Sequence, residues 1–145
     1  MVKPGKQNAQ KVSRRSADMS TRPDGRVYVP PPKEACEEYH YPVPIDDAGL
    51  VQFVWAQRAY RGHVVDFSIE IQVRDHAMAD WQTAYRIDSS HGTIHEHRYS
   101  PTGEQRVEIE EIPLKDSWKF VDTWFTKAME MCDDAWATHV ERWRR

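Results

Sequence analysis

Three histidines within seven positions are the residues of this chain best placed to do chemistry. The segment RIDSSHGTIHEHRY, residues 86–99, carries His91, His95 and His97 out of seven histidines in all. Imidazole can accept or donate a proton near neutral pH, and it is also a common metal ligand. Arg86 precedes them with a planar fork of donors suited to phosphate, and Asp88 offers a carboxylate that can orient an imidazole. The segment therefore indicates proton transfer, metal binding or a solvated polar strand face.

Alternation along a strand decides which of these side chains can meet. Residues two apart point the same way, so His95 and His97 share one face and Ile94 lies on the other. Ile94 is the only apolar residue of its set, so we take its side as the covered side of the sheet and expect both histidines on the open side. Arg86 and Asp88 alternate with apolar residues in the preceding segment. They join the histidines if the two strands pair in a suitable register.

Proton transfer by this set would suit RNA cleavage without a metal. His95 and His97 would act as general acid and base, taking a proton from a ribose 2′-OH and returning one to the 5′ oxygen. Arg86 would hold the phosphate, with Asp88 and His91 in support. The hypothesis is a metal-independent endoribonuclease that needs no cofactor.

Two other interpretations use the same residues differently. His91, His95 and His97 could hold a divalent transition metal such as zinc in a small-molecule enzyme. Alternatively, the histidines only decorate a polar strand of a non-catalytic protein-interaction module, whose contact would be the apolar edge of a long helix near Trp124.

The elements that must position these residues follow from periodicity. Period-two alternation predicts strands at 51–60, 64–74, 81–88, 93–99 and 106–112, and short turns between them favour an antiparallel meander. After Pro113, with Asp116 or Ser117 as a possible cap, apolar residues recur every three or four positions and predict a helix over 117–143, about 40 Å long. Its stripe comprises Trp118, Val121, Phe125, Ala128, Cys132, Trp136, Val140 and Trp143. The expected fold class is α+β, an antiparallel meander of about five strands packed on one long C-terminal helix.

Charge divides the chain unevenly. Residues 1–26 hold seven Lys or Arg against two Asp, a net charge of +5, and contain few bulky apolar residues, so we expect a disordered basic arm. A Pro-rich extended strap over 27–44 leads into a single α+β domain over 45–145, whose acidity counts against a nuclease. Two cysteines and the lack of a long apolar run predict a cytoplasmic protein that does not enter a membrane.

The stretch RIDSSHGTIHEHRYSPTGE, residues 86–104, resembles small bacterial proteins of the TumE type, the toxin partners of toxin–antitoxin pairs. These proteins tend to have an Arg-aromatic-Asp step, a histidine-rich stretch and a return strand. Arg86, Asp88, His91, His95 and His97 match that pattern, with Ile87 in place of the aromatic. The histidine stretch here is shorter, and the arm and strap are additional. The resemblance implies an RNA-directed toxin, with RNA as its substrate and a cognate antitoxin protein as its partner.

Overall fold

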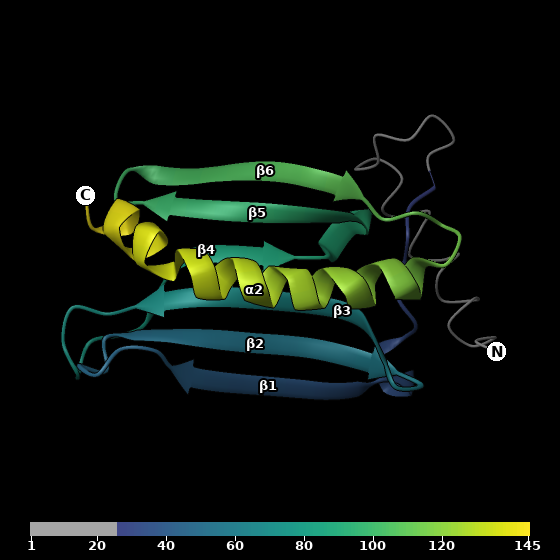
Figure 1. Cartoon of the computed structure of the whole chain (residues 1–145), viewed down its shortest axis with the longest axis horizontal. Helices are drawn as coiled ribbons and strands as arrows, with labels where there is room; N and C mark the ends of the chain where they lie inside the picture. Colours follow the sequence, from purple (N-terminus) through teal and green to yellow (C-terminus); the bar gives the residue numbers. More distant parts are fainter. Residues whose placement is uncertain (1–25) are drawn as a thin grey trace.

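The fold is an antiparallel meander covered on one face by a single long helix. The computed structural model describes residues 26–145, so all but the last residue of the basic arm lies outside the described part. The elements run in the order η2 (Lys33–Ala35), β1 (Glu37–Pro44), β2 (Val51–Tyr60), β3 (His63–Val73), β4 (Gln82–Asp88), η3 (Ser90–Gly92), β5 (Thr93–Ser100), β6 (Gly103–Glu111) and α2 (Ser117–Arg144). The six strands pair in sequence order, and α2 lies across the sheet (Figure 1). The expected α+β class is confirmed.

The sixth strand comes from the proline-rich strap. Its last part, Glu37–Pro44, pairs antiparallel with β2, so the meander has one strand more than the sequence predicted. Proline lacks an N–H and is excluded from the middle of a sheet, but β1 is an edge strand and needs hydrogen-bond partners on one side only. Pro42 and Pro44 are therefore accommodated, opposite Val54 and Gln52 of β2.

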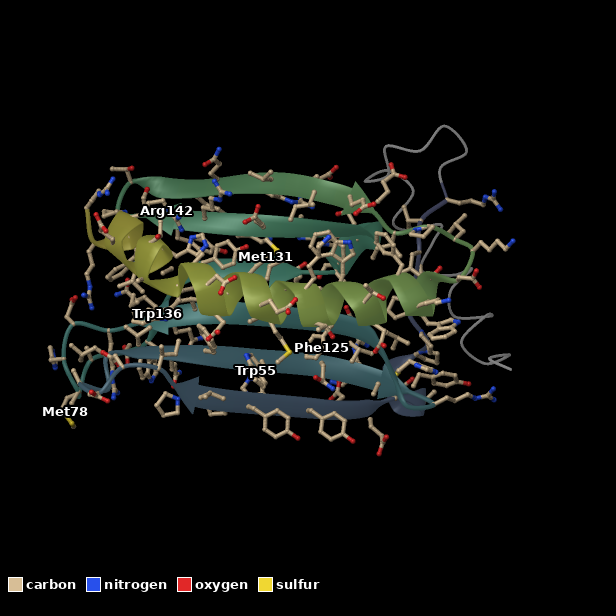
Figure 2. All side chains as sticks on the ribbon, viewed as in Figure 1. Trp55, Met78, Phe125, Met131, Trp136 and Arg142 are labelled. Atoms are coloured by element: carbon tan, nitrogen blue, oxygen red, sulfur yellow. The ribbon has the colours of Figure 1, made fainter. Side chains whose placement is uncertain are left out.

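The centre of the sheet forms the core. Alternating residues of β3, from Val65 to Val73, are buried against α2, as the alternation predicted. Figure 2 labels Trp55 of β2 and Phe125 of α2 along the lower edge of the helix. Both pack against the buried cluster.

Helix α2 meets the sheet with a slightly different face from the predicted one. Trp124 was expected off the centre of the stripe and open to a partner, but it is 7% exposed, and its indole N–H donates to the Glu110 carboxylate of β6 at 3.2 Å. Trp118, expected on the stripe, is exposed and packs against the ring of His63. Asp116 precedes the helix in a left-handed conformation and makes no side-chain cap, while the Ser117 hydroxyl donates to the carbonyl of Pro113. The indole N–H expected to reach a partner is thus bonded to the protein's own β6.

The segment before β1 passes beside η3. The Tyr28 hydroxyl donates to the Val65 carbonyl at 2.7 Å, and Val27 is buried against Gly92. Gly92 has a φ of +78°, and a Cβ there would lie 2.8 Å from the Cβ of Val27. Both the close approach and the left-handed backbone require glycine. Within residues 26–145, no helix is long and apolar enough to cross a membrane.

Candidate active site on the open face of the sheet

The register of β4 and β5 brings the predicted residues together. Asp88 lies directly opposite His95, and Arg86 lies directly opposite His97. Their side chains occupy the face of the sheet that α2 leaves uncovered, which points away from the viewer in Figure 1. Ile94 is fully buried on the helix side, as expected. The sequence could not fix this register, and the structure supplies it.

Asp88 is the centre of the cluster. It is 3% exposed, and one carboxylate oxygen, Oδ1, accepts from His95 Nε2 at 2.9 Å and from the backbone N–H of Ser90 at 3.0 Å. The other oxygen, Oδ2, lies 3.0 Å from Arg86 Nε and 3.6 Å from His97 Nε2. Burial alone would raise the pKa of Asp88, but the hydrogen bond and charge of His95, the Ser90 N–H and Arg86 lower that pKa to about 2. The carboxylate is therefore ionised at neutral pH.

The contacts of His97 define which ring nitrogen is available. Its Nε2 lies 3.1 Å from Arg86 Nη2, and because a guanidinium can only donate, Nε2 accepts. The proton of a neutral ring is then on Nδ1, which is hydrogen-bonded to the Glu104 carboxylate of β6. His97 is 7% exposed, and 34% of the Arg86 side chain is exposed. This arrangement, a carboxylate behind one nitrogen and a lone pair on the other, is typical of an imidazole that accepts a proton or ligates a metal.

His95 is more enclosed than the open face suggested. It is 2% exposed, with Nε2 on Asp88 and Nδ1 within 3.1 Å of the Thr93 hydroxyl and 3.3 Å of the Thr93 carbonyl. With both nitrogens already partnered, the ring has no free position for a substrate.

His91 lies at the edge of the cluster. Residue 91 is exposed, with a φ of +59° in η3, and its ring centroid is 6.5 Å from that of His95. One ligand atom each from Asp88, His95 and His97 lies within 4.8 Å of the others. The structure thus brings together four of the five predicted residues and leaves His91 at the edge. The set of three residues able to hold a metal ion contains Asp88 instead of His91, which the sequence suggested as the third ligand.

Sequence reasoning missed Glu104 and Thr93. Glu104 follows His97 by seven residues, across the tight turn between β5 and β6, and pairs with Tyr99, so it is a diagonal neighbour of His97. The signal was available in the turn residues Pro101 and Gly103, but using it requires the exact hairpin register.

A cavity lies next to the cluster on the same face. Its volume is about 250 Å³, and its lining includes Arg58, Asp66, Ser68 and Ser90. Ser68 is paired with Asp88 across β3 and β4, so the cavity lies over the strands that neighbour the cluster, but its lining contains none of the five predicted site residues.

A second polar cluster lies on the covered face, under the end of α2. The Tyr85 hydroxyl donates to Glu96 at 2.6 Å, and the Tyr85 ring stacks on His139 at 3.8 Å. His139 Nδ1 accepts from Arg142, whose side chain also reaches the carbonyl of residue 84; Figure 2 labels Arg142 near the last turns of the helix. Burial, Arg142 and Arg98 lower the pKa of His139 to about 4. This His is neutral, enclosed by protein and separated from the open-face cluster by the sheet.

Comparison with known proteins adds a family but no activity. No curated protein and no solved structure matches the chain. Residues 36–144, which include all six strands and α2, match the family described as "Domain of unknown function (DUF7718)". The match covers most of the chain and begins just before β1, which agrees with the edge strand being part of the domain. The chain belongs to the DUF7718 family.

Proposed function

We propose that this protein is an RNA-cleaving enzyme, a toxin-type endoribonuclease, and that the open-face cluster is its active site. The observation that carries the proposal is the contact between Arg86 Nη2 and His97 Nε2 at 3.1 Å, because it places a phosphate-binding cation beside a proton acceptor. The resemblance to TumE-type proteins directs the proposal toward RNA.

In this proposal His97 is the general base. A phosphodiester that engages Arg86 takes the guanidinium away from His97 and frees the Nε2 lone pair. His97 Nε2 removes the proton of the 2′-OH, the 2′ oxygen forms a bond to phosphorus, and the bond from phosphorus to the 5′ oxygen breaks. The 5′ oxygen leaves with a proton from water. The products are a 2′,3′-cyclic phosphate and a 5′-OH end.

The remaining residues hold the base in place. The Glu104 carboxylate accepts a hydrogen bond from the Nδ1–H of His97 and stabilises the imidazolium that forms when Nε2 takes the substrate proton. Asp88 anchors Arg86 and His95, and His95, being 2% exposed, is a positioning residue rather than the second acid that the sequence suggested. His91 has no assigned step.

The acidic body of the domain repels RNA, so the proposed enzyme relies on the basic arm to attract the substrate. An antitoxin protein is the expected partner, in the cytoplasm where RNA is available, and the basic arm over 1–26 would supply attraction for RNA. Binding through that arm releases counterions, so cleavage is expected to weaken steeply as salt rises.

The test uses a labelled RNA of mixed sequence, purified protein and EDTA at low salt. The wild type is expected to cleave it to cyclic-phosphate ends and to leave a fully 2′-O-methylated RNA intact, since that substrate has no 2′-OH proton to remove. Arg86→Met should lose cleavage while keeping its fold, and His76→Ala, in an exposed loop, should keep it. Cleavage of the 2′-O-methyl substrate, or none of either RNA by folded protein, overturns the proposal.

A further inference from the structure

We propose that the same cluster binds a divalent transition metal ion of the zinc type through Asp88 and the Nε2 atoms of His95 and His97. We further propose that the bound ion displaces Arg86 and stops RNA cleavage. The metal site stands on geometry alone, whereas the inhibition rests on the proposed function.

The candidate ligand atoms lie close together. Asp88 Oδ1 lies 2.9 Å from His95 Nε2, Asp88 Oδ2 lies 3.6 Å from His97 Nε2, and one ligand atom from each residue lies within 4.8 Å of the others. In a tetrahedral zinc site with bonds of about 2.0–2.2 Å, neighbouring ligand atoms lie about 3.3–3.6 Å apart, so the observed separations are near those that a metal ion requires. All three residues are buried, so neighbouring atoms already hold their side chains close to these positions. Only a small movement is needed to bring the ligand atoms to metal-binding distance. Two imidazoles and one carboxylate favour zinc, cobalt or nickel over magnesium or calcium, which take mostly oxygen ligands.

The atoms behind the ligands also fit a metal site. A histidine that binds metal through Nε2 usually donates its Nδ1 proton to a carboxylate or a backbone carbonyl. His97 has Glu104 at Nδ1, and His95 has the Thr93 carbonyl at 3.3 Å. His97 already has its Nε2 lone pair free of a proton, as its contact with Arg86 requires. His95 has only to move its proton from Nε2 to Nδ1, where Thr93 accepts it.

Arg86 is the competitor for this site. Its Nε is 3.0 Å from Asp88 Oδ2 and its Nη2 is 3.1 Å from His97 Nε2. The positively charged guanidinium is thus bonded to two of the three residues that would bind the metal ion. A metal ion must displace it, and its partly exposed side chain can turn toward solvent. The metal ion and the proton of the substrate 2′-OH both need the lone pair on His97 Nε2. The metal-bound protein therefore has no general base available for RNA cleavage.

The test is a titration of EDTA-treated, dialysed full-length protein with Co²⁺, followed by visible absorption, and with Zn²⁺, followed by calorimetry. We expect one ion per chain. Asp88→Asn, which keeps the shape of the carboxylate, and His97→Gln should each weaken binding by about a hundredfold or more, and Glu104→Gln by about tenfold. His91→Ala and His76→Ala should bind as the wild type does, while excess Mg²⁺ should not compete.

Arg86→Met separates the two proposals because they predict opposite effects. Without the competing charge, this variant should bind Zn²⁺ more tightly than the wild type by about tenfold or more, even though it has lost RNA cleavage. Zinc-saturated wild type should lose the cleavage seen in EDTA. Circular dichroism confirms that each variant is folded.

Several results would overturn the metal site. These are the absence of one-to-one binding, binding that Asp88→Asn leaves unchanged, or binding that His91→Ala abolishes. Binding that depends on Asp88 in a protein that never cleaves RNA would support the metal site and contradict the proposed function. Cleavage that rises with zinc would overturn the inhibition.

Discussion

Replacing His139 with glutamine is expected to make the fold less sensitive to acid. His139 is 8% exposed, stacked on Tyr85, and faces Arg142 and Arg98 as well as the carboxylate of Glu96. Its pKa falls from 6.5 to about 4 on folding, so the unfolded chain binds a proton there before the folded chain does. Above pH 6.5, the His139 pKa in the unfolded chain, the titration of His139 does not change the unfolding free energy. As the pH falls from 6.5 to 4, the unfolding free energy decreases. This difference between the pKa of His139 in the unfolded and the folded chain corresponds to about 3 kcal/mol of unfolding free energy.

The assay is urea unfolding at pH 7 and at pH 4, with each protein compared with itself so that the cost of the substitution cancels. The wild type should lose about 3 kcal/mol more between the two pH values than His139→Gln does. Glutamine can still accept the Arg142 hydrogen bond but does not titrate. His76→Gln, at an exposed position, should behave as the wild type. An equal loss in wild type and His139→Gln would mean that the folded state does not select the neutral form of His139.

Three further predictions concern stability and reactivity. Gly92→Ala should lower the unfolding free energy by about 1–3 kcal/mol in urea melts. The alanine Cβ would lie 2.8 Å from the Cβ of Val27, and the φ of +78° at this position is unfavourable for alanine. An unchanged unfolding midpoint would contradict the close approach. Asp88 has a pKa of about 2, below its ordinary 3.8, so it contributes about 2 kcal/mol that is present above pH 3.8 and is lost as the pH falls through 2. Asp88→Asn should lack that acid loss in urea melts compared between pH 4 and pH 2, and a loss equal to that of the wild type would count against the assignment. Burial raises the pKa of Cys132 to about 12, so a thiol reagent at pH 8 should modify the half-buried Cys36 first and Cys132 only on unfolding, which mass spectrometry of the modified peptides can check.

Local patterns predicted most of the fold because burial and periodicity coincide in it. Strand β3 alternates without interruption and is buried as predicted. Strand β1 was not predicted because Pro42 and Pro44 argue against a strand unless its position at the sheet edge is known, and that position depends on the whole topology. The exposure of Trp118 and the burial of Trp124 likewise depend on how α2 is rotated against the sheet, which the stripe does not determine to within one residue.

The sequence predicted which face of the sheet carries the site residues, but it did not predict which of these residues contact one another. Ile94 correctly marked the covered side, which placed His95 and His97 on the other. The pairing of Asp88 with His95, and the role of Glu104, follow from strand register, which a sequence constrains weakly where both faces carry polar residues. The contact of Glu96 with Tyr85 on the covered face was not predicted either, because a buried polar residue is stable only with a partner and that partner comes from another strand.

The role of His97 as general base can be measured as the rate of RNA cleavage in EDTA by wild type and His97→Ala. We expect the wild type to cleave and the variant, with its fold intact, to be slower by about a hundredfold or more, the usual contribution of a general base. Equal rates in the two proteins, or no cleavage by the folded wild type at low salt, would contradict the assignment of this cluster as a nuclease active site.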